Sequence, residues 1–407
     1  MEKRSVRTAA RSLVRSATQG EIMRHVRGHE RSLSRAQLTE HLGVSRSKVS
    51  LEVGQLVGAG LLVEDGLGES EGGRRSSLLR IPRGAGLVAA VDLGATSADV
   101  AVTTLGGEVI GRTGEPADIR EGPDRVLGRA VELLSGLLDE QGADAREVIA
   151  VGVGLPGPVE YASGRPTVPP IMPGWDSYPI QEAFAGWYEA PVFVDNDVNI
   201  MALGEHRGGL GRGVENMLFV KIGTGIGCGI VVEGRLYRGS QGSAGDIGHV
   251  RAAPDGPVCA CGNVACLEAM AAAPAIVREA ERIAGLERGG ALAALREAEE
   301  LDLGSVLQAA TYGDAGAVGI VRRSGRLIGE TLATLVSVLN PSLIVIGGGV
   351  AYAASHTLLA EVRSAVYHRS LPLATRNLPI VLSELGEDAG VVGASVMAAE
   401  GVLEVHA

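Results

Sequence analysis

Apolar positions in the first eighty residues recur every three or four residues, which is the period of short amphipathic helices. A helix is predicted over residues 21–27. Ser34, with Gln37 three residues later, forms a capping-box pattern that opens a second helix over residues 35–42. After a short turn, a third helix runs from residue 45 to about residue 59. The positions expected to face a core are Ala36, Leu38 and Leu42 in the second helix and Val49, Val53, Leu56 and Val57 in the third.

Two helices joined by a glycine turn at this spacing predict a helix-turn-helix, which places its second helix in the major groove of DNA. Residues 61–66 and 76–81 then predict two paired strands that would form a wing. The alternative is a small helical domain for protein contacts. The residues expected to contact DNA are Arg35, Ser45, Arg46, Ser47, Lys48 and Ser50 on the helices, and Arg74 and Arg75 at the tip of the wing.

From Leu87 onward the pattern changes to strands separated by glycine turns. The first strand runs into Asp92, Gly94 and Thr96, and a second strand and a third follow it. A dinucleotide-binding fold would instead open a helix after its glycines. The observed kind of turn offers backbone N–H groups and a hydroxyl to a phosphate, with a carboxylate near a metal ion.

A second glycine turn, Gly223, Thr224 and Gly225, also leads into an alternating, strand-like segment. Two equivalent hairpin turns, one in each half, predict an internally duplicated α/β fold whose lobes close on a cleft. A third glycine run, which contains Gly348, ends a buried strand where a nucleoside could lie. Each turn alone could be an ordinary tight turn, and the order of all three carries the prediction.

Between these turns a buried strand over residues 192–194 ends in polar residues and leads into a helix. Carboxylates at the carboxyl end of a strand face the crevice in which α/β proteins bind ligands. Asp197 is suited to accept a proton from a substrate hydroxyl, or only to hydrogen-bond that hydroxyl. The alternative is that Asp195 or Asp197 caps the helix.

Three of the four cysteines, Cys259, Cys261 and Cys266, lie within eight positions, and His249 precedes the first by ten residues. Three thiolates and one imidazole suit tetrahedral Zn²⁺, and four protein ligands make a closed, structural site. The alternatives are buried free thiols, or a disulfide with one cysteine left over.

The formal net charge of −11 conceals a division of the chain. Residues 1–83, which begin with a basic tail over residues 1–17, contain fifteen Lys or Arg and nine Asp or Glu, whereas the remainder contains 22 and 39. This indicates that only the amino-terminal part meets a polyanion such as double-stranded DNA. No run of eighteen apolar residues is present, and the Arg-rich start lacks the apolar core of a secretory signal. We therefore expect a cytoplasmic protein with no membrane partner.

Taken together, these motifs resemble the ROK family (repressors, open reading frames and sugar kinases), in its transcriptional-regulator branch. The likeness covers nearly the whole chain, and GSAGDIGH followed by CACGNVACLE is its most specific part. The resemblance implies an α/β protein: a winged helix-turn-helix at residues 1–83, then a two-lobed, actin-like ATPase (ribonuclease H-like) duplicated fold. The first lobe is expected over residues 84–197, completed by a carboxy-terminal helix at about 387–407. The second lobe, with the zinc loop, is expected over residues 198–386.

The resemblance also implies roles for residues. Structural zinc would be held by His249, Cys259, Cys261 and Cys266. A sugar would be contacted by Gly157, Asn196, Asp197, Asp246, His249 and Glu268. If the chain is a kinase, ATP and Mg²⁺ would be held by Asp92, Gly94, Thr96, Gly223, Thr224, Gly225 and Gly348. In kinase members the aspartate that matches Asp197 is the general base of phosphoryl transfer.

Three residues depart from the family pattern. Asp246 stands where the family usually has Glu, Ile171 where it often has an asparagine that contacts the sugar, and Ala265 where a glycine is common. An apolar Ile171 cannot satisfy a buried hydroxyl, and leaving one unpaired costs ~1–3 kcal/mol. The ligand is therefore expected to be a modified, less hydroxylated or phosphorylated sugar, or another molecule, rather than an ordinary hexose.

The leading hypothesis is a DNA-binding repressor whose lobes bind a sugar-like effector. Ligand binding would change the closure of the lobes and so the spacing of two heads in a homodimer or tetramer. The rival hypothesis is an ATP-dependent sugar kinase that also binds DNA. A third is a zinc-bearing scaffold without a ligand.

Overall fold

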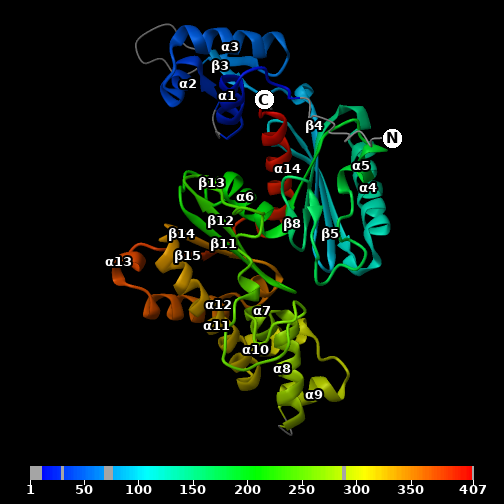
Figure 1. Cartoon of the computed structure of the whole chain (residues 1–407), viewed down its shortest axis with the longest axis vertical. Coiled ribbons are helices and arrows are strands. Elements are labelled where there is room, and N and C mark those ends of the chain that lie inside the picture. The colour runs from blue at the N-terminus through cyan, green and yellow to red at the C-terminus, as the bar shows by residue number, and fades with distance from the viewer. Residues whose placement is uncertain (1–11, 29–31, 68–76, 287–289, 406–407) are drawn as a thin grey trace, which may run out of the picture.

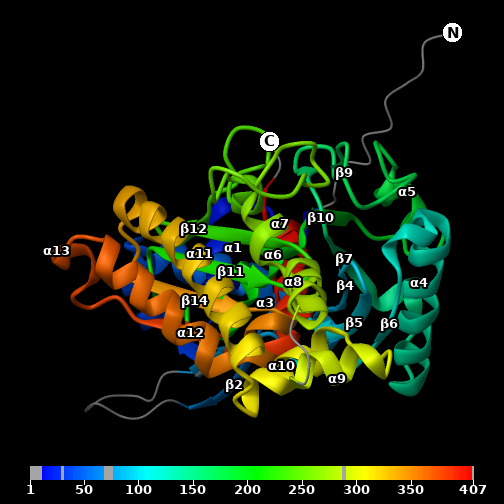
Figure 2. The ribbon, with the colours of Figure 1, turned by 90° about the horizontal axis from the view of Figure 1, so that it is seen from below.

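The structure is a computed structural model that describes residues 12–28, 32–67, 77–286 and 290–405. The amino-terminal elements form a head at one end of the molecule, and two groups of elements, each built around a five-stranded sheet, lie below it (Figure 1). The last helix of the chain runs between the head and both groups. Figure 2 shows the same arrangement from below, with α4 on one outer side and α12 and α13 on the opposite side.

In its described residues the head contains three helices and a small antiparallel sheet of order β1-β3-β2. Ser34 caps the second helix as predicted, because its hydroxyl accepts a hydrogen bond from the Gln37 N–H and the Gln37 side chain accepts from the Ser34 N–H. Gly43 ends that helix with φ +63°, a left-handed conformation that favours glycine. The elements are α1 (Ala17–Gly28), β1 (Leu33–Ser34), α2 (Arg35–Leu42), α3 (Arg46–Gly58), β2 (Val63–Leu67) and β3 (Ser77–Arg80).

For two residues of the head, the prediction that they are buried in the core is wrong. Ala36 is exposed, and Val57 is 37% exposed. Val57 lies about 90° around the helix from the centre of the buried stripe of α3, since each residue advances about 100°. The remaining buried position of that stripe is a charged residue, Glu52, whose carboxylate accepts from the Gln19 side chain and pairs with Lys48.

The first sheet has the order β10-β7-β4-β5-β6. The predicted strand, hairpin, strand pattern is confirmed, because β4, β5 and β6 are successive antiparallel neighbours and β7 and β10 run parallel to β4. α4 covers one face of this sheet and α14 the other. The elements are β4 (Leu87–Leu93), β5 (Ser97–Thr104), β6 (Val109–Pro116), α4 (Pro123–Glu140), β7 (Val148–Leu155), β8 (Val159–Glu160), β9 (Arg165–Pro166), α5 (Ile180–Ala185), β10 (Val192–Asn196) and α14 (Ala389–Val402).

The second sheet repeats this scheme in the order β13-β12-β11-β14-β15. A hairpin, β11 with β12, again lies beside parallel strands, which confirms the predicted duplication. In the described part of residues 267–311 the chain forms four helices. The elements are β11 (Met217–Ile222), β12 (Ile226–Val232), β13 (Arg235–Leu236), α7 (Leu267–Ala271), α8 (Ala273–Leu286), α9 (Ala291–Glu297), α10 (Leu303–Thr311), α11 (Ala315–Leu339), β14 (Leu343–Gly347), α12 (Gly349–Arg369), α13 (Pro372–Thr375) and β15 (Ile380–Leu382).

α6 (Asp197–Gly208) and α14 cross at short range in the middle of the molecule. A Cβ added at Gly393 would lie 1.7 Å from the Ile200 carbonyl oxygen, so only glycine permits this approach. The far end of α14 contacts the head, where the Leu13 N–H donates to the Val402 carbonyl at 2.9 Å. As predicted, the last helix returns to the first sheet. It also joins that sheet, the head and α6.

In the part of the chain that the structure describes, no helix combines the length and the apolar character needed to cross a membrane.

Candidate functional site

A cleft of about 850 Å³ opens between the two sheets. Its lining includes every residue that the sequence predicts for a sugar or a nucleotide, although these residues come from widely separated segments. Ile171 also lines it, so this departure from the family pattern does concern the site. The predicted residues in the lining are Asp92, Gly94, Thr96, Gly157, Asn196, Asp197, Gly223, Thr224, Gly225, Asp246, His249, Glu268 and Gly348.

Asn196 joins two sides of the cleft wall. Its amide nitrogen donates to the Gly157 carbonyl at 3.0 Å, and its amide oxygen accepts from the Val198 N–H at 2.9 Å. Asn196 is therefore the N-cap of α6, where sequence reasoning had considered Asp195 or Asp197. The next residue, Asp197, is buried at the start of the helix with its carboxylate at the cleft.

Asp195 is tied to the second half of the body by a residue that sequence reasoning missed. Its Oδ2 accepts from Arg238 Nε at 2.7 Å, and its Oδ1 accepts from the Asn199 amide at 2.8 Å. The guanidinium of Arg238 lies 3.8 Å above the centre of the Tyr161 ring. This partly buried ion pair therefore connects the end of β10 with the segment after β13.

Lys221 is the second residue that was missed. It lies on β11, lines the cleft, and its ammonium forms an ion pair with the Asp197 carboxylate. Burial lowers the pKa of Lys221, but the nearby Asp197 and Asp92 carboxylates outweigh this effect, so the net shift of the pKa is upward. A sequence signal existed, because this is the only lysine after residue 48 and it interrupts an apolar strand beside a glycine turn.

Asp92, the second-last residue of β4, lies at the other wall of the cleft. Burial raises the pKa of Asp92 to about 7, although Lys221 opposes the shift. The Gly390 backbone packs against this carboxyl, and a Cβ there would lie 1.7 Å from Asp92 Oδ2. The other oxygen, Oδ1, is buried without a hydrogen-bond partner among the described residues.

The glycine turn at the end of β14 is sterically required. Gly348 has φ +94°, and a Cβ at this position would lie 2.5 Å from the Ile222 carbonyl oxygen. The turn between β11 and β12 is also tightly surrounded, since a Cβ at Gly225 would lie 3.0 Å from Glu268 Oε2. Both turns therefore bring bare backbone to the cleft.

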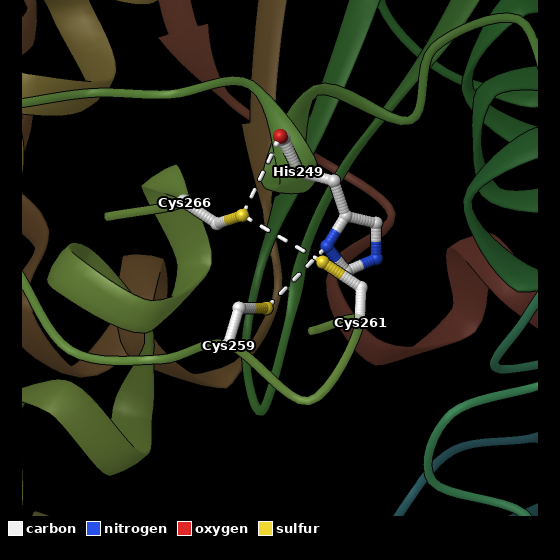
Figure 3. A group of neighbouring side chains, drawn as sticks. All are labelled: His249, Cys259, Cys261 and Cys266. Carbon is white, nitrogen blue, oxygen red and sulfur yellow. Dashed lines mark hydrogen bonds between the residues drawn. The ribbon is translucent and has the colours of Figure 1, made fainter. Parts of the chain in front are cut away.

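His249, Cys259, Cys261 and Cys266 converge at one end of the cleft, with their ligand atoms all within 4.8 Å of one another (Figure 3). His249 ends a short 3-10 turn, η4 (Ile247–His249), and Cys266 immediately precedes α7. The Cys261 and Cys266 sulfurs are 3.7 Å apart, and His249 Nδ1 lies 3.5 Å from Cys259 Sγ.

These separations fit a tetrahedral zinc ion. Zn–S bonds of about 2.3 Å and Zn–N bonds of about 2.0–2.1 Å place two sulfurs about 3.8 Å apart and a sulfur and a nitrogen about 3.5 Å apart. All four cysteines are free, so the disulfide alternative is wrong for this structure. Ala265, inside the loop, has φ +60°, the conformation for which the glycine common in relatives is suited.

Two carboxylates connect this cluster to the cleft. Glu268 Oε1 lies 3.2 Å from Cys259 Sγ and 3.5 Å from His249 Nδ1, and Asp246 Oδ1 lies 3.8 Å from the other imidazole nitrogen, Nε2. If Nδ1 holds the metal, Nε2 points toward Asp246, on the side from which carboxylates orient zinc-bound histidines, but at a distance longer than a hydrogen bond. Order in the cysteine loop therefore fixes the side chains that face a ligand.

The residues predicted for DNA that the structure describes lie on α2 and at the start of α3. Ser45 caps α3 by accepting from the Lys48 N–H at 3.3 Å, and the side chains of this first turn are exposed. Arg35 pairs with Glu64 at 2.8 Å. The predicted residues on α3 are Arg46, Ser47, Lys48 and Ser50, all exposed; Arg74 and Arg75 lie outside the described residues.

Residues 88–400 match the ROK family. The chain belongs to the ROK family. Among its relatives, the xylose repressor of Caldicellulosiruptor bescii is 27% identical over 365 residues, which cover 90% of this chain and 91% of the repressor. The glucokinase of Halalkalibacterium halodurans is 34% identical over 305 residues, which cover 74% of this chain and 92% of the enzyme.

A solved structure of a ROK family transcriptional regulator, a homologue of the E. coli MLC protein, superposes with a TM-score of 0.81 and 26% identity. It covers 95% of this chain and 98% of its own. The ROK match begins only at residue 88, so a regulator that covers 95% of the chain also spans most of the head. The chain therefore has the extent of a ROK regulator, whereas the glucokinase matches three-quarters of it.

Proposed function

We propose that this chain is a transcriptional repressor whose head is a winged helix-turn-helix that binds a double-stranded DNA operator, and whose cleft binds a sugar-like effector. The observation that carries the proposal is the presence of the head. A xylose repressor and a ROK transcriptional regulator match the chain over 90% and 95% of its length, which includes much of the head. The glucokinase leaves about a quarter of the chain unmatched. The domain boundaries proposed are 1–83 for the head, 84–197 with 387–407 for the first lobe, and 198–386 for the second.

On the DNA side, α3 is proposed as the recognition helix. Arg46, Ser47 and Ser50 are exposed at its start, where such a helix meets base edges. The Lys48 ammonium lies 2.5 Å from a Glu52 carboxylate oxygen, so its role is to neutralise that buried carboxylate and to approach phosphates. Arg74 and Arg75 remain in the proposal as wing contacts.

On the effector side, the cleft offers many acceptors and few cations. Asp246 and Glu268 line the cleft from the zinc loop, and Asn196 and Asp197 line it from the start of α6. Among the described residues that line the cleft there are seven carboxylates but only two fixed cations, Lys221 and Arg112. Acceptors of this kind suit hydroxyl or amino groups, and like-charge repulsion disfavours the phosphorylated sugar considered from the sequence. We therefore propose an uncharged or amino sugar as the effector.

Zinc would act in this function as a structural ion. The four ligands His249, Cys259, Cys261 and Cys266 close its coordination shell and leave no position for a substrate. Its contribution would be to hold the loop that carries Asp246 and ends at Glu268.

The route from the cleft to the head would run through two helices. α6 begins at Asn196 and Asp197, packs on α14 through glycine contacts, and α14 ends against the head at Val402. An effector that binds one arrangement of the lobes better than the other would shift α6 and α14 together. In a homodimer or tetramer, which we propose because winged heads read paired half-sites, this would change the spacing of the heads. Such a regulator would act in the cytoplasm, without a membrane partner.

The second candidate is a sugar kinase. The match to a glucokinase and the retention of Asp197 in the cleft favour it. In that case ATP and Mg²⁺ would be held by the glycine turns and Asp92, and Asp197 would accept the hydroxyl proton.

The test begins with a thermal-shift screen of the zinc-loaded protein against neutral sugars, amino sugars and sugar phosphates. Sugars that raise the melting temperature are then added to fluorescence-anisotropy titrations with DNA fragments from upstream of the chain's own gene. Glu268→Gln removes one cleft charge, so it should lose the rise in melting temperature with the sugar and keep DNA binding. Arg46→Ala should lose DNA binding and still be stabilised by the sugar. DNA affinity that no stabilising sugar changes would refute the proposal.

A further inference from the structure

Asp197, which a kinase would use as its general base, forms an ion pair with Lys221 in this cleft. Lys221 reaches into the cleft from β11, and its side chain is 22% exposed, while that of Asp197 is 6% exposed. Both side chains are therefore largely shielded from solvent. The pair is thus a fixed part of the cleft floor.

Both oxygens of Asp197 have partners. Oδ1 accepts from the Val198 N–H at 2.8 Å, and Oδ2 is bound to the Lys221 ammonium. Each carboxylate oxygen keeps a further lone pair, so Asp197 can still accept a hydrogen bond from a ligand. Its negative charge, however, is already balanced by the Lys221 ammonium.

The surroundings of Lys221 also bear on a divalent cation. Mg²⁺ is bound in such enzymes by one or two carboxylates together with substrate phosphates. Asp92 and Asp197 are the cleft carboxylates that influence Lys221 most strongly, and both raise its pKa. The ammonium therefore already occupies the electrostatic position that a metal ion would take, and a second cation there would be repelled.

We propose that Lys221 is a built-in cation that replaces the divalent metal ion in this cleft, so that the site binds an effector through Asp197 without binding Mg²⁺ and ATP for phosphoryl transfer. This inference rests on the proposed function as a sugar-responsive regulator. Lys221 is then the residue that separates sensing from catalysis in this chain. The donor set of the cleft thus does not fit a catalytic Mg²⁺.

The acid Asp92 is consistent with this assignment. Its Oδ1 is buried without a hydrogen-bond partner among the described residues, and it is the open ligand a metal would use if the positive charge beside it were removed. Loss of the ammonium should therefore create a metal site rather than merely weaken the fold. A purely structural ion pair makes no such prediction.

The experiment measures Mn²⁺ binding by electron paramagnetic resonance, using the full, zinc-loaded chain without DNA. Wild type and Lys221→Arg, which keeps the charge, should show no cleft-dependent binding. Lys221→Met, which keeps the length of the side chain, should bind Mn²⁺ with a Kd at least about tenfold below the weakest binding detectable for wild type. The double variant Lys221→Met with Asp92→Asn should lose that gain, which locates the ion at the cleft.

Wild-type protein that binds Mn²⁺ as tightly as Lys221→Met, or that transfers phosphate from Mg·ATP to a sugar with activity lost in Asp197→Ala, would overturn the inference. Zinc content and circular dichroism report whether Lys221→Met is folded. If it is not, the comparison of wild type with Asp92→Asn decides, since Mn²⁺ binding lost on that substitution overturns the proposal and its absence in both supports it. DNA binding is measured separately, so a failed repressor assignment and a failed metal assignment are distinguishable.

Discussion

Replacing Arg238 by Met tests whether the two halves of the body are held together at the end of β10. In the structure Arg238 Nε donates to Asp195 Oδ2 at 2.7 Å, and the Asp195 side chain is only 2% exposed. Met keeps most of the apolar length of the arginine and removes the charge. The substitution therefore leaves a buried carboxylate without its cation.

The expected loss can be worked out from the contacts. Removing one partner of a buried ion pair costs about 3–5 kcal/mol. The stacking of the guanidinium on Tyr161 adds about 0.5–2 kcal/mol. Asp195 keeps two hydrogen bonds on Oδ1, from the Asn199 amide and the Asn196 N–H, and Arg238 is 21% exposed, so water can reach part of the gap. We expect a decrease of about 3 kcal/mol in the free energy of unfolding, at the low end of the range for buried pairs.

The assay is urea unfolding of the zinc-loaded protein, followed by far-ultraviolet circular dichroism. Arg235→Met is the matched control, since this arginine is exposed on β13, three residues earlier. An exposed substitution should change the free energy of unfolding by less than about 0.5 kcal/mol. Adding Asp195→Asn to Arg238→Met should recover part of the loss, because a neutral amide is cheaper to bury than an unpaired carboxylate.

Equal unfolding midpoints for Arg238→Met and Arg235→Met would refute this reasoning. That result would mean that water replaces the guanidinium at Asp195 without cost, and that the two halves are held together by other contacts. A loss that the added Asp195→Asn makes worse would also contradict it, because the cost would then not come from the unpaired charge.

Three further predictions concern the loop, the head and the cleft. Cys261→Ser should lose bound zinc by atomic absorption, whereas Cys228→Ser, which alters a buried thiol far from the loop in sequence, should retain it; equal zinc in both would remove Cys261 from the ligand set. Arg46→Ala should weaken operator binding at least about tenfold and reduce the preference for the operator over unrelated DNA, and unchanged affinity would discard α3 as the recognition helix. Asp92 releases its proton near pH 3.8 when unfolded but at about 7 when folded, so its contribution to stability is full below that range and is lost as the pH rises through it. Asp92→Asn should therefore gain stability relative to wild type as the pH rises from about 4 to 7, with no further gain above that, and a constant difference would contradict the raised pKa.

Local patterns in the sequence determined the elements of this protein well. The capping box at Ser34 and the strand, hairpin, strand order after Leu87 are encoded within a few residues, and both are found in the structure. The four zinc-type ligands were also visible, since three of them lie within eight positions. Burial was predicted less well, as Val57 and Ala36 show, because a small domain buries only a narrow stripe of each helix.

What only the tertiary structure decided is which distant residues meet. Lys221 and Arg238 carry no recognisable motif, yet each lies against an aspartate from the end of β10 or the start of α6. A charge in an apolar strand can be a buried partner or an exposed exception, and its sequence neighbours do not distinguish the two. Partners far apart in sequence are selected by how the sheets and helices pack, so the chemistry of this cleft depends on contacts that no local pattern contains.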